Sequence, residues 1–139
     1  MKNALFGIIL LTSTLEASAK PCMMIFDNGE SITLPAALSQ TAQVKGLSGN
    51  NNDLGLILAW KTAEPRSVWM KDTHNPLTAV FIGTNGVIQS IQDMQPNSDT
   101  VHSSLHPTMA IIEMRTEKFK QFKLSQGDKV TSSQCFPLK

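Results

Sequence analysis

Residues 68–77 have the sequence VWMKDTHNPL, and residues 77–83 continue as LTAVFIG, the most apolar run beyond the N-terminal segment. The first half of this stretch predicts a strand. Pro76 has no N–H to give to a sheet and biases Asn75 towards an extended conformation, so the second half predicts a turn. The sequence therefore gathers a Trp, a Lys, an Asp and a His at the rim of a central strand pair. This rim is the first surface to examine for a site.

The N-terminus has the features of a secretory signal. Lys2 supplies a positive charge, residues 4–15 form an apolar segment, and Ala17-Ser18-Ala19 resembles a signal-peptidase cleavage site. The apolar segment is shorter than the roughly 20 residues that a membrane-spanning helix needs. We therefore expect residues 1–19 to be removed as a signal peptide. The remaining residues 20–139 would form a single periplasmic or secreted domain with no membrane span.

Two cysteines, Cys22 and Cys135, lie near the two ends of the predicted mature chain. Lys20 and Pro21 occupy positions where a lipoprotein has small residues, so a lipid anchor on Cys22 is not expected. An isolated pair of cysteines in an oxidising compartment is most simply explained by a disulfide. The alternative is two separate buried thiols.

The charged residues argue against a nucleic-acid-binding protein. The chain has 12 Lys and Arg against 11 Asp and Glu, which gives a net charge of +1. The basic residues are scattered apart from Lys118, Lys120 and Lys123, so they form no basic stripe.

The pattern of apolar residues predicts many short strands. Asn28-Gly29 and Asn85-Gly86 are typical of tight hairpin turns between antiparallel strands. The expected strands cover residues 23–26, 31–34, 54–60, 66–71, 77–83, 87–91 and 108–114, with a last one from Val130. Short helices are expected within 36–45, stopped by Gly46, and over 117–122, capped by Thr116. Pro35 is expected to end the second strand, and residues 92–106 to form a long irregular loop. The fold class is therefore mainly β: one compact antiparallel β-barrel or sandwich with one or two short helices.

Several motifs resemble one known family in their order and spacing. They are Gly46-Leu47, Gly55-Leu56-Ile57-Leu58, Trp69-Met70-Lys71-Asp72-Thr73, Pro76-Leu77, Asn85-Gly86-Val87-Ile88, Ile112-Glu113 and Gln126-Gly127-Asp128. The chain resembles the family called domain of unknown function 192. This resemblance implies a compact, jelly-roll-like β-barrel with a short helix, often behind a signal peptide, and no established activity.

Three positions depart from that family's usual pattern. Asp72 stands where the family usually has Asn, and Thr78 stands where it usually has Asp. The segment Ser48-Gly49-Asn50 lies where the family usually has an Arg. Any activity that depends on the usual Asp and Arg is therefore in question for this chain.

The rim residues suggest a ligand site. Strand alternation places Trp69 and Lys71 on the same side, so an indole could form the floor of a pocket with Lys71, Asp72, Thr73 and His74 at its mouth. Glu113, at the end of an apolar strand, completes the set of candidates. The alternative is structural: Trp69 lies in the core, and Glu113 pairs with Lys71 or with backbone donors.

Catalysis and metal binding receive less support. The sequence has no Gly-x-Ser-x-Gly motif, although a periplasmic hydrolase or transferase that uses Asp72 and His74, with Glu113, remains an alternative. His102 and His106 could join them in a metal site, but no third sequence-local ligand exists. We therefore favour a non-enzymatic binding or accessory domain, without metal or cofactor. It would recognise a small ligand or an envelope protein. A role as an accessory or chaperone-like subunit of an envelope or secretion machine is a further alternative.

Overall fold

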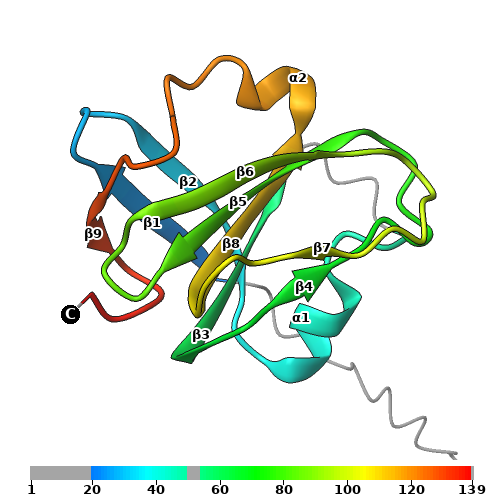
Figure 1. Cartoon of the computed structure of the whole chain (residues 1–139), viewed down its shortest axis with the longest axis horizontal. Helices are drawn as coiled ribbons and strands as arrows, with labels where there is room; N and C mark the ends of the chain where they lie inside the picture. The colour runs from blue at the N-terminus through cyan, green and yellow to red at the C-terminus, as the bar shows by residue number, and fades with distance from the viewer. Residues whose placement is uncertain (1–19, 50–53, 139) are drawn as a thin grey trace, which may run out of the picture.

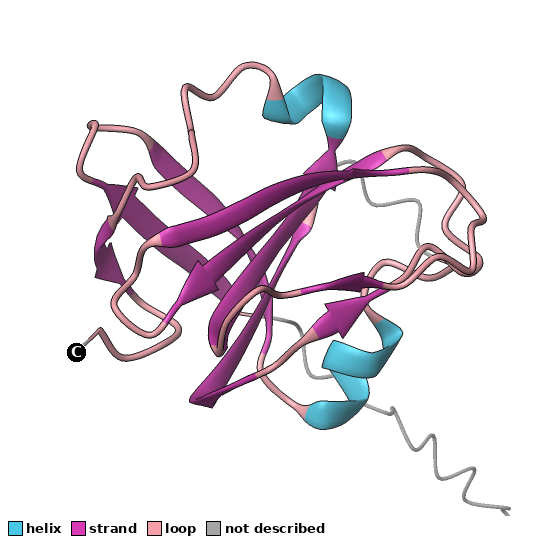
Figure 2. Cartoon of the chain, in the orientation of Figure 1, coloured by secondary structure: helices cyan, strands magenta, loops and turns pink. Residues whose placement is uncertain are grey.

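The computed structural model describes residues 20–49 and 54–138, and the predicted signal peptide 1–19 lies outside them. Figure 1 labels the elements, and Figure 2 shows that strands dominate. In chain order they are β1 (Pro21–Phe26), β2 (Ser31–Ala37), α1 (Gln40–Lys45), β3 (Leu56–Glu64), β4 (Ser67–Val68), β5 (Leu77–Gly83), β6 (Ile88–Met94), β7 (His102–Ser103), β8 (Thr108–Arg115), α2 (Thr116–Phe119) and β9 (Val130–Ser133).

One curled sheet organises the described residues. Its seven strands follow the order β6-β5-β8-β3-β2-β1-β9, and β4 pairs separately with β7. Neighbouring strands of the large sheet are antiparallel except β2 and β3. The sheet bends into a half-barrel (Figure 1). The prediction of a mainly β, barrel-like fold with two short helices is confirmed.

The two faces of the sheet pack into different apolar clusters. On β5, Val80 and Ile82 belong to one cluster, whereas Ala79 and Phe81 belong to the other. Every residue of β5 is buried, which explains why this strand has a continuous apolar sequence rather than an alternating one. Glu113 of β8 lies opposite Ala79, so its side chain shares the face of the second cluster.

A disulfide joins the two ends of the described chain. Cys22 in β1 is bonded to Cys135, which follows β9, and their Cα atoms lie 5.6 Å apart. Cys22 is almost fully buried. The predicted pairing is confirmed.

The first hairpin and helix follow the sequence prediction, with one correction. β1 and β2 pair around the Asn28-Gly29 turn, and α1 ends at Lys45 with Gly46 as its C-cap, whose N–H donates to the Ala42 carbonyl. The prediction that Pro35 ends the second strand is wrong. The strand continues to Ala37 because it changes partners there and pairs in parallel with β3.

Later boundaries also differ. The strand predicted over 66–71 is only Ser67–Val68, because the chain buries Met70 and then turns at Asp72, which has a φ of 53°. Thr116 does not cap the second helix, since Arg115 holds the N-cap position. The predicted loop 92–106 is interrupted, because β6 extends to Met94 and β7 pairs with β4.

Candidate functional site

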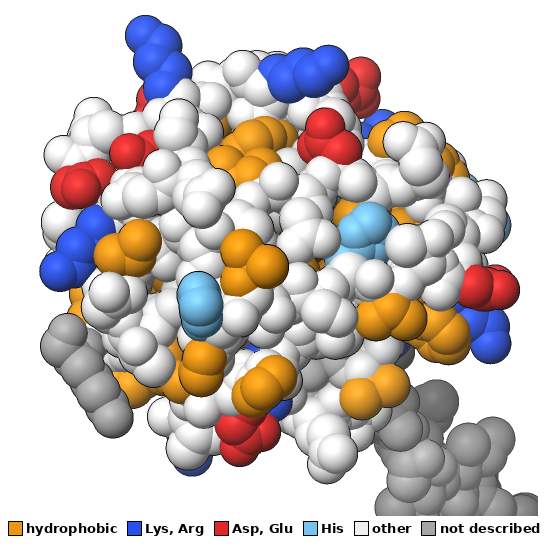
Figure 3. Space-filling model, in the orientation of Figure 1, with side chains coloured by type: hydrophobic (Ala, Val, Ile, Leu, Met, Phe, Trp, Pro, Cys, Tyr) orange, Lys and Arg blue, Asp and Glu red, His pale blue; other side chains and the backbone are white. Residues whose placement is uncertain are grey.

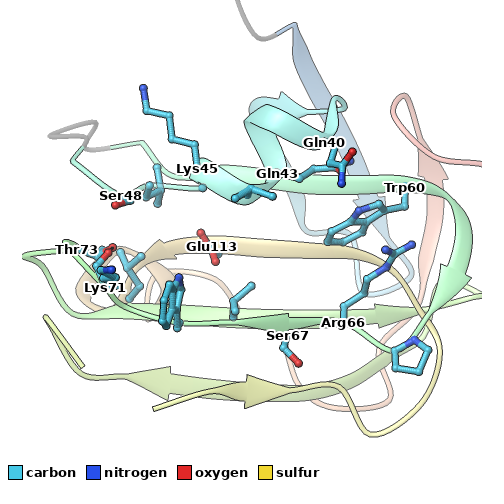
Figure 4. Close-up of a pocket in the computed structure, with 17 residues that line it drawn as sticks. Gln40, Gln43, Lys45, Ser48, Trp60, Arg66, Ser67, Lys71, Thr73 and Glu113 are labelled. Carbon is cyan, nitrogen blue, oxygen red and sulfur yellow. Dashed lines mark hydrogen bonds between the residues drawn. The ribbon is translucent and has the colours of Figure 1, made fainter. Parts of the chain in front are cut away.

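A cleft of about 450 Å³ opens between α1, the β3–β4 connection and the segment that follows β4. Figure 4 shows Trp60 and Arg66 at one end of it, Lys71 and Thr73 at the other, and Glu113 between them. The cleft lies on the face of the sheet that carries the second apolar cluster, because Leu77 belongs to both. It is the natural place to look for ligand binding.

Glu113 is the most unusual group in the cleft. Its side chain is only 5% exposed, and it projects from β8 towards α1 (Figure 4). Within the described chain, no hydrogen bond or ion pair to its carboxylate is found. Burial disfavours the charged form and raises the pKa of Glu113 to about 7. A buried carboxyl group without a partner costs free energy, and such groups are concentrated at functional sites.

Arg66 covers the indole of Trp60 at one end of the cleft. Its Cζ atom lies 4.3 Å from the ring centroid, within the range of a cation–π contact. Its Nη2 donates to the Thr62 carbonyl, and its Nη1 lies 3.5 Å from a carboxylate oxygen of Glu64. The Nε atom of Arg66 is buried and has no hydrogen-bond partner in the part of the chain that the structure describes. Arg66 is therefore held in place but keeps one donor unused.

Lys71 and Trp69 form a similar pair at the other end. The Nζ of Lys71 lies 5.4 Å from the Trp69 ring centroid. Trp69 is 50% exposed, so the alternative that placed its indole in the core does not hold. Since Lys71 is directed to the indole, the alternative ion pair between Lys71 and Glu113 is not formed either.

One backbone hydrogen bond and two from side chains hold the walls of the cleft in place. The N–H of Gly49, after α1, donates to the carbonyl of Asp72. The side chain of Gln43 on α1 donates to the Ala59 carbonyl over 2.7 Å. The Thr73 hydroxyl donates to the Lys71 carbonyl. These bonds hold the helix against β3 and fix the turn that carries Trp69.

The structure brings together four of the six predicted ligand-binding residues. Trp69, Lys71, Thr73 and Glu113 line the cleft, whereas Asp72 and His74 are exposed and do not. Asp72 departs because its positive φ turns the chain at this point. The described residues contain no cluster of three or more His, Cys, Asp or Glu side chains that could hold a metal ion.

Sequence reasoning missed the end of the cleft that Trp60 and Arg66 form, and it also missed Lys45. Trp60 was expected only as the last residue of a buried strand. The signal that could have found it is that Trp60 is one of only two Trp in the chain and lies six residues before Arg66, at the start of the next predicted strand.

The comparisons support the predicted family. The sequence matches the model of the family described as "Uncharacterized ACR", domain of unknown function 192, over residues 23–132. The chain belongs to this family. No curated protein matches it.

Two solved structures of similar proteins share the fold of this family member. One is a candidate transcription regulator from Sinorhizobium meliloti 1021, with a TM-score of 0.70 and 25% identity, covering 83% of this chain and 95% of that one. The other is a protein of unknown function from Novosphingobium aromaticivorans, with a TM-score of 0.68 and 24% identity, covering 81% and 84%.

The three departures from the usual pattern of domain of unknown function 192 lie in different places. Asp72 is exposed and does not line the cleft. Thr78 is fully buried on the other face of β5, where its hydroxyl is hydrogen-bonded to Asp93 over 2.7 Å and to Thr116 over 3.1 Å. It does not line the cleft. Ser48, which begins the segment where the family usually has an Arg, does line it. Of the three departures, only the one that begins at Ser48 reaches the cleft wall.

Proposed function

We propose that this protein binds a small ring-bearing ligand in the cleft, with the ring stacked on Trp69. The observation that carries the proposal is the half-exposed indole of Trp69 in the same cleft as the buried carboxyl group of Glu113, which has no partner among the described residues. An exposed aromatic face favours stacking of a sugar or planar ring. A buried polar group that lacks a protein partner favours a ligand that supplies one.

Binding is better supported than catalysis by the Asp72 and His74 pair. Both side chains lie outside the cleft lining, and Glu113 is the only carboxylate among its described residues. A hydrolase of this type would need a second acid or base near the first. A small ligand is also favoured over a broad protein surface. On the face shown in Figure 3, hydrophobic side chains form separate patches among polar ones.

The two tryptophans offer a direct test. Trp60 and Trp69 are the only tryptophans in the chain, and both line the cleft. In Trp60→Phe the fluorescence reports on Trp69 alone, and in Trp69→Phe on Trp60 alone. We expect ring-bearing fragments that bind to change the Trp69 emission, and Trp69→Ala to weaken their binding while leaving the protein folded. A fragment library that changes neither emission would contradict the proposal.

We also propose that the working protein is exported after removal of residues 1–19. The disulfide between Cys22 and Cys135 supports an oxidising compartment. No described helix is long and apolar enough to cross a membrane. Expression of the full chain in a bacterial host, followed by fractionation and N-terminal sequencing, tests this proposal. A mature protein that begins at Lys20 in the periplasm or medium is expected, and an uncleaved cytoplasmic protein would contradict it.

A further inference from the structure

Most of the charged side chains that line the cleft are positive. Lys45, Arg66 and Lys71 face a single acid, Glu113. The chain as a whole has a net charge of only +1, so this excess of positive charge belongs to the cleft rather than to the general composition. Positive charge gathered at a low-dielectric concave surface attracts anions.

None of these basic residues neutralises Glu113. The guanidinium of Arg66 lies against Trp60 and Glu64, and the ammonium of Lys71 lies over Trp69. Lys45 points away from Glu113 in Figure 4. Arg115, two residues after Glu113 on β8, lies near Glu117 instead, with 3.9 Å between Nη1 and Oε1.

Without a counter-charge, a buried carboxyl group favours its neutral form, in which it has an O–H donor. A bound anion would favour this form further, because like charges repel. The cleft can therefore present a hydrogen-bond donor from Glu113 together with the cations of Arg66 and Lys71. The unpartnered Nε of Arg66 adds another buried donor.

We propose that the ligand is a ring-bearing carboxylate of the acidic-sugar class, whose anionic group accepts a hydrogen bond from protonated Glu113. The inference rests on the proposed ligand-binding function and names the chemical class of the ligand. The ring of the ligand stacks on Trp69, and the positive charges of Lys71 and Arg66 attract its carboxylate. Binding is then coupled to proton uptake at Glu113.

The coupling gives the binding a defined pH dependence. The pKa of Glu113 is about 7, so raising the pH from 6 to 8 removes most of the protonated form and weakens binding about tenfold. The other charged groups that line the cleft are Lys45, Arg66 and Lys71. No histidine is among the described residues that line it.

The test uses three sugars that share a ring and differ in charge. Glucuronate, glucose and glucosamine are titrated into the purified, disulfide-bonded mature protein, and binding is followed by NMR shifts of the cleft residues. At pH 6 we expect glucuronate to bind about tenfold more tightly than glucose, as one charge-assisted interaction would give. Glucosamine is expected to bind most weakly.

Glu113→Gln separates the proton-coupled mechanism from simple charge attraction. The amide keeps a donor at every pH, so glucuronate should bind this variant at pH 8 about as tightly as it binds the wild type at pH 6. Glu117→Gln, on α2 and outside the cleft, is the matched control and should keep the pH dependence of the wild type.

Several outcomes overturn the inference without removing the proposed function. They are equal or tighter binding of glucose or glucosamine, a glucuronate affinity that does not change between pH 6 and 8, and failure of all three sugars while other fragments bind the cleft. If the fragment library also finds no cleft ligand, the proposed function itself fails.

Discussion

Gly55 lies directly against the backbone of Glu113. A Cβ atom on Gly55 would clash with the Glu113 carbonyl oxygen and lie 3.0 Å from the Met114 Cβ. Gly55 also has a φ of +107°, which side chains rarely adopt. This close approach lets β3 begin beside β8, opposite Glu113. A glycine of the family motif thus helps to place the acid in the cleft.

Gly55→Ala should therefore destabilise the fold strongly. We expect a loss of about 2–4 kcal/mol, because the positive φ and the overlap with the neighbouring strand both cost free energy. Urea unfolding measures the loss. Gly29→Ala is the matched control, since Gly29 has a φ of +88° but nothing within 4 Å of its added Cβ. A loss at Gly55 no larger than that at Gly29 would contradict the close approach.

The contribution of Glu113 to stability should depend on pH. Its pKa is raised from 4.5 to about 7 in the folded protein. Between these values the folded state keeps a proton that the unfolded state releases, so stability falls as the pH rises through this window. Above pH 7 the total loss in the free energy of unfolding is about 3 kcal/mol.

Glu113→Gln should remove this dependence and be more stable than the wild type at pH 8. Thermal unfolding of both proteins from pH 4 to pH 8 measures the difference, with Glu117→Gln as the control for a surface acid. Parallel pH profiles for wild type and Glu113→Gln would show that Glu113 does not titrate in this range.

The two tryptophans should differ in their importance for folding. Trp69 is 50% exposed, so Trp69→Ala should change the free energy of unfolding by less than about 1 kcal/mol. Trp60 packs against the second apolar cluster and under Arg66, so Trp60→Ala should cost about 2 kcal/mol. Urea unfolding of the two variants measures these losses, provided that the slopes of the transitions are equal. A larger loss of stability in Trp69→Ala than in Trp60→Ala would contradict the placing of Trp60 in the core and Trp69 at the surface.

Reduction of the disulfide should destabilise the protein. Cys22 and Cys135 are 113 residues apart, and closing so long a loop contributes about 4–5 kcal/mol in the chain-entropy model. The urea midpoint should fall on reduction, and Cys22→Ala/Cys135→Ala should show the reduced midpoint whether or not a reductant is present. A midpoint that does not respond to reduction would mean that the bond adds no stability.

The secondary structure could be predicted best where local chemistry decides it. The Asn-Gly turns, the apolar run 77–83 and the stop at Gly46 follow from backbone preferences that each short segment carries by itself. The predictions for Pro35 and Thr116 were wrong because they relied on local preferences alone. Their roles depend on partners distant in sequence: β3 for the strand that contains Pro35, and Thr78 for the hydroxyl of Thr116.

The sequence alone determined the family, the β-rich fold and the pairing of Cys22 with Cys135. It also singled out Trp69, Lys71 and Glu113 as candidate site residues. Only the tertiary structure decided which side chains share a cleft, because it brings α1, the β3–β4 connection and β8 together. A single turn at Asp72 removes that side chain from the cleft, and the ends of β3 and β4 add Trp60 and Arg66 to it. Distances between segments far apart in the sequence follow from how the sheet curls and packs, and no local pattern encodes them.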